Sequence, residues 1–159
     1  MDKERPDKEE LDEYEIYDRE CKKIKAKNKK LIKIFKDEMA ENNLPKKTIK
    51  DQASDVDFFL NEFLLREDPI PMEEGASNLN GFFSYVIRKC MWSTPENIET
   101  MADSLKKFYK CMMDHGEVDE DLYEIIEEEI DSRVRIWQIQ WRAWNDPNKK
   151  IESVFDIFF

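Results

Sequence analysis

The chain has 159 residues, of which 40 % are hydrophobic and only three are glycine, and its net charge is −11. This length fits one compact domain, and the scarcity of glycine indicates a mostly helical protein. No apolar run approaches the ~20 residues of a membrane-spanning helix, and the charged N-terminus is unlike a signal peptide. Three widely spaced cysteines argue against a disulfide framework, so we expect a cytoplasmic protein with reduced thiols.

The charge is distributed unevenly along the chain. Residues 1–21 carry −6, residues 22–50 carry +8, and residues 51–159 carry −13. Such a basic block can present a local positive face on an acidic protein, because physiological salt screens charges over ~8 Å. The alternative is that these lysines only solvate a helix and pair with the neighbouring acids.

The first helix is predicted over residues 7–43, where apolar residues recur in alternating steps of three and four. This stripe comprises Tyr14, Tyr17, Cys21, Ile24, Asn28, Leu31 and Phe35. It can pack on the domain, pair with a second copy in a homodimer, or be partly disordered at its acidic start. Pro45 ends the helix, because the residue before a proline is pushed out of the helical region.

The next two helices are predicted over residues 46–65 and 77–91, with a loop that contains two prolines between them. Three lysines crowd the start of the first of these helices: Lys46, Lys47 and Lys50. The helix dipole favours acids at this end, so three lysines there require a reason. Contact with an anionic partner would supply one.

The last two helices are predicted over residues 95–114 and 119–144. Thr94 suits the N-cap of the former and Pro95 its first helical position, while Gly116 suits its C-terminal stop. With no clear strand, these patterns predict an all-α bundle of about five helices. We expect its core to contain the aromatic residues Phe35, Phe59, Phe63, Phe82, Phe83 and Phe108.

Three tryptophans share one stripe of the 119–144 helix, namely Trp137, Trp141 and Trp144. A stripe of this kind is more often core than a ligand site. Tryptophan also dominates binding hot spots, so the three residues are the candidate surface for a protein partner. The apolar tail over residues 151–159 must dock on the protein or expose its phenylalanines.

The sequence offers few residues for catalysis or metal binding. Cys111 and His115 have a spacing that can ligate a metal from one helix face, but no second pair completes a tetrahedral site. His115 is the only histidine, and no glycine-rich phosphate loop is present. We therefore expect no enzyme, no metal, no cofactor and no small-molecule substrate.

Two segments share one plan, in which a Lys- and Thr-bearing entrance leads to an apolar stripe that ends in aromatics. They are LPKKTIKDQASDVDFFLNEFL and STPENIETMADSLKKFYKCMMDHG, and LIKIFKDEMAENN precedes the first. In this order they resemble the core-binding domain of phage-integrase-type tyrosine recombinases over about residues 27–115. The resemblance implies a SAM-like four-helix bundle, with residues 1–26 as a helical extension and residues 116–159 as a C-terminal helix and tail.

In that family this domain clamps duplex DNA while a separate domain cuts it. Only about 44 residues follow His115, and none is a histidine, so we expect the catalytic domain to be missing. The resemblance implies a non-catalytic DNA-binding protein that grips duplex DNA through Lys46, Lys47, Thr48, Lys50, Lys106, Lys107 and Lys110. The alternative is an acidic helical protein–protein interaction module that keeps the fold but not DNA binding.

Overall fold

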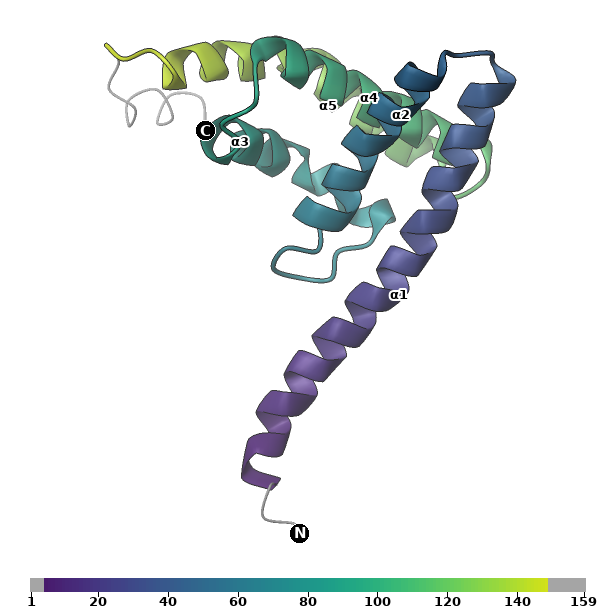
Figure 1. Cartoon of the computed structure of the whole chain (residues 1–159), viewed down its shortest axis with the longest axis vertical. Coiled ribbons are helices and arrows are strands. Elements are labelled where there is room, and N and C mark those ends of the chain that lie inside the picture. Colours follow the sequence, from purple (N-terminus) through teal and green to yellow (C-terminus); the bar gives the residue numbers. More distant parts are fainter. Residues whose placement is uncertain (1–4, 149–159) are drawn as a thin grey trace.

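The computed structural model describes the backbone of residues 5–148 and side chains from residue 12 onward, and all regular structure in this range is helical (Figure 1). The elements are α1 (Arg5–Glu41), α2 (Lys46–Asp57), the π-helical η2 (Phe58–Phe63), the 3₁₀-helical η3 (Met72–Asn78), α3 (Leu79–Lys89), α4 (Pro95–Asp114) and α5 (Glu120–Trp144). The all-α prediction is confirmed. The predicted apolar tail lies outside the described residues.

The helix ends follow the local chemistry of the sequence. The side chain of Thr94 accepts a hydrogen bond from the backbone N–H of Asn97 at 3.0 Å, and Pro95 occupies the first helical position of α4. Gly116 has a φ of 80° after α4, and Asn43 has a φ of 63° after α1. Both conformations are left-handed, so they stop the helices as glycine and asparagine commonly do.

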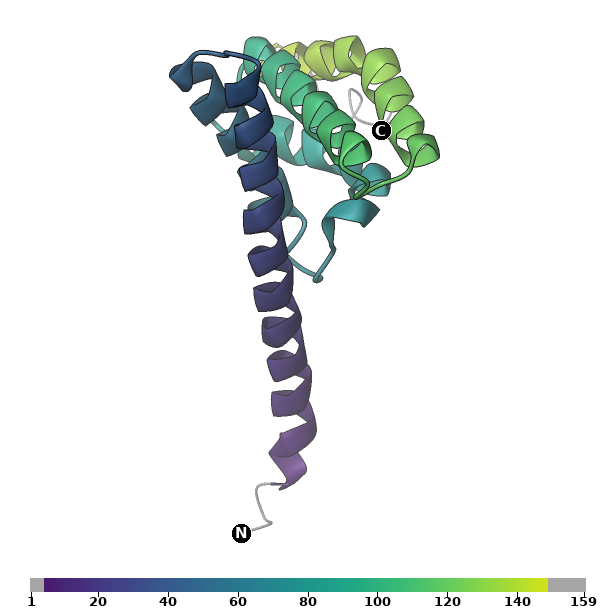
Figure 2. The ribbon, with the colours of Figure 1, turned by 90° about the vertical axis from the view of Figure 1, so that its right-hand side faces the viewer.

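Helix α1 packs on the bundle from Tyr17 onward, where the Tyr17 hydroxyl donates a hydrogen bond to the Leu65 carbonyl, while its N-terminal end projects away from the bundle (Figures 1 and 2). The side chains of Asn28, Leu31 and Phe35 are each 1 % exposed, whereas that of Tyr14 is 68 % exposed. The predicted apolar stripe therefore packs within the chain along most of its length. Asn28 within it donates a hydrogen bond to Asn61 Oδ1 at 2.8 Å.

The helix predicted over residues 46–65 forms, but its second half winds as a π-helix. The backbone N–H of Leu64 reaches the carbonyl of Phe59 at 3.0 Å, five residues back. Within this segment Phe59, Leu60 and Phe63 are buried, and Asn61 faces α1. The wider π turn thus lets the segment place several large side chains in the core while one amide meets the neighbouring helix.

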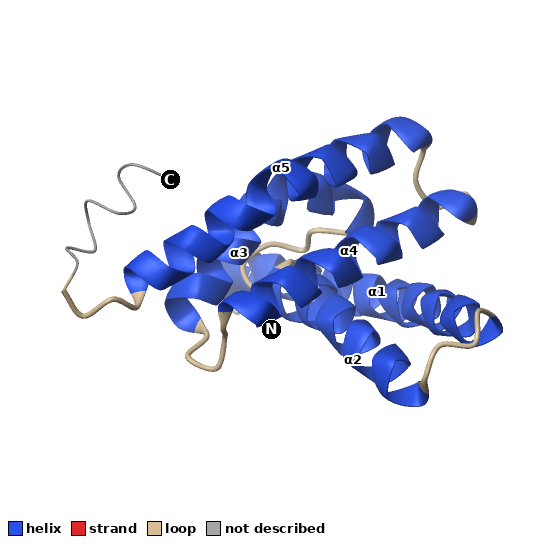
Figure 3. Ribbon diagram, turned by 90° about the horizontal axis from the view of Figure 1, so that it is seen from above, coloured by secondary structure: helices blue, strands red, loops and turns tan. Residues whose placement is uncertain are grey.

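An aromatic core joins the elements, and all six predicted core aromatics are buried. The ring of Phe82 lies 4.9 Å from that of Phe59, measured between centroids, and Phe83 stacks on Trp137 at 4.1 Å. Phe35 meets Phe108 edge to face at 5.5 Å, which fixes α1 on α4. Helices α4 and α5 lie side by side beyond α2 (Figure 3).

The tryptophan stripe of α5 belongs to this core. The indole of Trp137 is 0 % exposed and donates a hydrogen bond to Asn80 Oδ1 at 2.8 Å. Trp141 donates to the carbonyl of Ser93 at 3.1 Å, and Trp144 is half-buried against the core. The assignment of Trp137 to a partner-binding surface is wrong, because a fully buried ring cannot reach a partner. The side chains of Trp141 and Trp144 are also partly buried against the core.

Candidate nucleic-acid interface

Helix α1 carries eight lysines and no acid between Lys22 and Lys36. A helix of 37 residues is about 55 Å long, and these charges lie along its C-terminal half. Its C-terminal part runs beside α2, whose first turn carries further lysines (Figure 1). The chain reversal between the two helices therefore brings both sets of lysines to one side of the molecule.

Two adjoining grooves between α1 and α2 collect these lysines, with volumes of about 890 and 410 Å³. The grooves share Ile32, Lys36 and Asp57, so they form one continuous depression. We call it the lysine groove after the residues Lys25, Lys29, Lys30, Lys33, Lys36, Lys46 and Lys50 that line it. Its apolar floor is formed by Ile32, Ile49 and Ala53.

Within residues 12–148, most of these ammonium groups have no ionic partner. Lys33 pairs with Asp37 at 2.8 Å, whereas the other six lysines make no ion pair with any residue that the structure describes. Among the described residues that line the groove, Asp57 is the one acid, and it accepts a hydrogen bond from Asn61 at 2.7 Å. The lysine groove is thus a concentrated positive surface on a chain whose net charge is −11.

The spacing of α2 explains why its lysines face α1. Ile49 and Lys50 lie three and four residues after Lys46, and Ala53 lies four and three residues after them, so all four share one helix face. Ala53 is 5 % exposed at the contact with the rest of the bundle, and the two lysines flank this contact in solvent. Packing of Ile49 and Ala53 on the bundle therefore places Lys46 and Lys50 at the edge of the lysine groove.

The other predicted residues of α2 lie elsewhere. Lys47 forms an ion pair with Asp51 at 2.9 Å, and this hydrogen bond raises the pKa of the lysine. Thr48 lines a separate depression between α2 and α4 whose lining includes the acids Asp51, Asp55 and Asp103. Neither side chain contributes to the lysine groove.

The three predicted lysines of α4 line a different depression, beside Glu38 of α1 and Asn42 in the turn after it. Each of them pairs with an acid, as Lys106 with Asp131 at 2.6 Å, Lys107 with Asp103 at 3.1 Å, and Lys110 with Asp114 at 3.3 Å. The lysines that the resemblance grouped together on the two predicted helices therefore line separate depressions. Lys46 and Lys50 lie instead beside lysines of α1, which belong to the same +8 charge block.

Burial affects one acid in the depression next to the lysine groove. Desolvation raises the pKa of Asp55 to about 6, and a hydrogen bond from Ser104 at 2.8 Å opposes this rise. The side of α2 that faces α4 is therefore acidic and hydrogen-bonded. The side that faces α1 is basic and open.

Comparison with known proteins gives no family. The chain matches no protein-family model, no curated protein and no solved structure. The resemblance to the integrase core-binding domain stays a prediction from the hydrophobic pattern. No helix in the described part of the chain is both long enough and apolar enough to cross a bilayer.

Proposed function

We propose that this protein binds the phosphate backbone of duplex DNA through the lysine groove. The observation that carries the proposal is the set of six exposed lysines that form no ion pair in the described part of the chain, gathered from two helices around one depression. Lysine is a strongly hydrated point charge, which suits contact with phosphate oxygens more than recognition of base edges. The binding mode is therefore expected to be largely independent of DNA sequence.

The length of the lysine array favours a polymer over a single phosphate group. From Lys25 to Lys36 the helix rises by about 16 Å. Duplex DNA carries one negative charge per ~1.7 Å of its axis, so phosphates are available along the whole array. A small anion would meet only one or two of the lysines.

A salt titration with a short duplex of mixed sequence tests this function. Each neutralised phosphate contributes a log–log slope of about −0.9, so up to six contacts predict a slope of roughly −5. Affinity should then fall by about a thousandfold between ~50 and ~200 mM salt. Two duplexes of unrelated sequence should behave alike. Absence of binding at the lowest salt, or a slope near zero, would contradict the proposal.

A protein-interaction role is the second candidate, and one exposed apolar pair favours it. Met91 is 100 % exposed and Trp92 is 56 % exposed in the turn between α3 and α4. The ring of Trp92 meets Phe58 edge to face at 5.8 Å, so its orientation is fixed. Exposed tryptophan and methionine are typical of protein interfaces. If no duplex binds at low salt, this surface becomes the leading site.

A further inference from the structure

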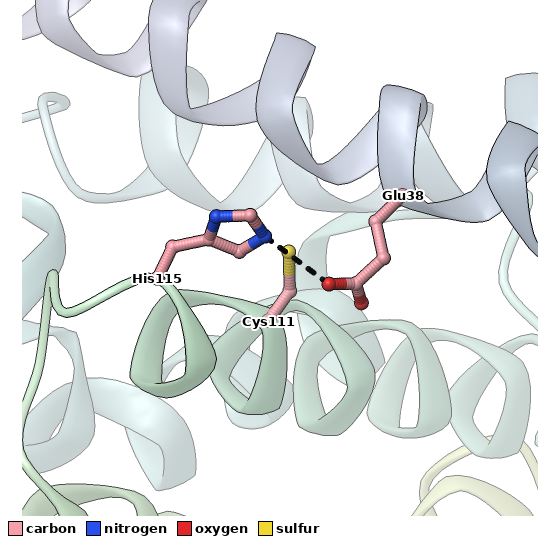
Figure 4. Close-up of side chains that lie close together, drawn as sticks. All are labelled: Glu38, Cys111 and His115. Atoms are coloured by element: carbon pink, nitrogen blue, oxygen red, sulfur yellow. Dashed lines mark hydrogen bonds and ion pairs between the residues drawn. The ribbon is translucent and has the colours of Figure 1, made fainter.

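Three side chains with metal-binding atoms converge where α1 crosses α4. Cys111 lies in the last turn of α4, His115 follows four residues later at the C-cap of this helix, and Glu38 reaches them from α1 (Figure 4). The Cys111 sulfur, the His115 imidazole and the Glu38 carboxylate lie within 4.8 Å of one another. His115 Nε2 and Glu38 Oε1 are 3.2 Å apart. The fold thus supplies a third ligand from a residue far from the Cys–His pair in the sequence.

We propose that Glu38, Cys111 and His115 bind one Zn²⁺ ion. Zinc takes carboxylate oxygen, imidazole nitrogen and thiolate sulfur at ~2.0–2.3 Å and prefers a tetrahedral arrangement. Two ligand atoms of such an ion lie ~3.3–3.7 Å apart, so small side-chain rotations convert the observed cluster into a coordination set. The ligands are of the borderline-soft kind that selects zinc over calcium or magnesium.

Access to the site is one-sided. Cys111 is 0 % exposed, whereas the side chains of Glu38 and His115 are 31 % and 46 % exposed. An ion can therefore enter past the carboxylate and the imidazole and meet the sulfur at the base of the site. Three protein ligands leave the fourth position to a water molecule on the solvent side.

Before a metal ion binds, the surroundings of Cys111 favour its protonated thiol over the thiolate. Burial raises the pKa of the thiol to about 12, and the negative charges of Glu38 and Asp114 add to the effect. Lys110 pairs with Asp114 on the same helix. A dication between the sulfur and the Glu38 carboxylate favours the thiolate instead, because its positive charge stabilises the negative sulfur. Binding forms the Zn–S bond and releases the thiol proton to solvent.

The ion would link α1 to α4 at the point where the projecting helix joins the bundle. Phe35 and Phe108 already fix the two helices from the core side. A ligand bound only by the native state adds RT ln(1 + [L]/Kd) to its stability, so zinc would hold α1 more firmly on the bundle. This role is independent of DNA binding, and it can be measured without any nucleic acid.

Cobalt titration of the full chain without an affinity tag tests the site, because Co²⁺ replaces Zn²⁺ and absorbs visible light. We expect saturation at one Co²⁺ per chain, intense d–d bands of a tetrahedral ion, a thiolate-to-cobalt charge-transfer band, and loss of all bands when Zn²⁺ is added. Cys111→Ser should abolish the charge-transfer band. The matched control Cys90→Ser replaces another buried cysteine, outside the cluster, and should leave every band in place.

A second variant covers the case in which Cys111→Ser does not fold. Glu38→Gln changes a half-exposed side chain and keeps its volume, and it should weaken Co²⁺ binding at least tenfold. Zinc should raise the Tm of the wild-type chain and of Cys90→Ser but not that of Glu38→Gln. The proposal is overturned if micromolar Co²⁺ gives no tetrahedral spectrum, or if Glu38→Gln binds Co²⁺ as the wild type does.

Discussion

Gly75 lies where η3 passes over the rings of two other elements. The buried hydroxyl of Tyr109 donates a hydrogen bond to the carbonyl of Met72 at 2.6 Å, which holds this segment against α4. A Cβ added at Gly75 would collide with the Tyr109 hydroxyl and meet the Phe59 ring at 3.0 Å. The core therefore tolerates only glycine here without a shift of one of these rings.

Gly75→Ala should lower the free energy of unfolding by about 1–3 kcal/mol, the usual cost of overpacking. Gly81→Ala in α3 is the control, because its Cβ would meet Phe63 at an ordinary 3.8 Å. Alanine also suits a helix interior better than glycine by ~1 kcal/mol, so this variant should be neutral or more stable. Urea unfolding measures both. Equal effects of the two substitutions would contradict the close approach at Gly75.

Residues whose role depends on immediate neighbours could be predicted from the sequence. Thr94, Pro95 and Gly116 act within one turn of their own position, so local chemistry identifies them. Trp137 could not be assigned in this way. A tryptophan on an apolar stripe suits both a core and a binding surface, and only the packing of α5 on Phe83 distinguishes them.

At the scale of elements, the five α-helices could be predicted because their apolar periods are long and regular. The π segment Phe58–Phe63 could not, since a helical period predicts an unbroken α-helix through it. Phe58 and Phe59 both contact Phe82, at 5.9 and 4.9 Å between ring centroids. The wider π turn allows Phe58 and Phe59, which are adjacent in the sequence, to contact the same ring. Phe82 reaches them only in the folded bundle, so the sequence does not reveal this contact.

The contact between α2 and α4 contains a carboxyl group whose protonation affects stability. Ser104 is 1 % exposed and donates a hydrogen bond to Asp55 at 2.8 Å, while burial raises the pKa of Asp55 to about 6. The folded chain then holds this proton more tightly than the unfolded chain, whose aspartates titrate near ~4. The contribution of Asp55 to stability is complete below that value and is lost as pH rises through about 6.

Asp55→Asn should therefore be more stable than the wild type at neutral pH by about 1–2 kcal/mol, after allowance for solvent screening of a partly exposed group. Asparagine keeps an oxygen that can accept the hydrogen bond of Ser104. The advantage should shrink as pH falls through about 6 and disappear below ~4, where the aspartic acid becomes neutral in both states. Urea unfolding at several pH values measures the difference. A difference that stays constant with pH would show that Asp55 titrates normally.

At the scale of the whole molecule, the lysine groove exists because α1 and α2 lie side by side after a short connection. The +8 block contained all seven of its lysines, but their shared groove could not be deduced from their order. Similarity of two sequence segments instead grouped the α2 lysines with those of α4. Glu38 illustrates the same limit, since only the crossing of α1 over α4 brings it to Cys111 and His115.

Comparison of two charge-matched triple variants in a DNA salt titration tests the lysine groove most directly. One variant changes Lys29, Lys36 and Lys50 to glutamine within the groove, and the other changes the ion-paired Lys106, Lys107 and Lys110. Both lose three positive charges, so long-range repulsion of DNA rises equally. The groove variant should flatten the salt slope by roughly three units and the α4 variant by less than about one. Equal flattening by the two variants, or an unchanged slope in the groove variant, would contradict DNA binding through the lysine groove.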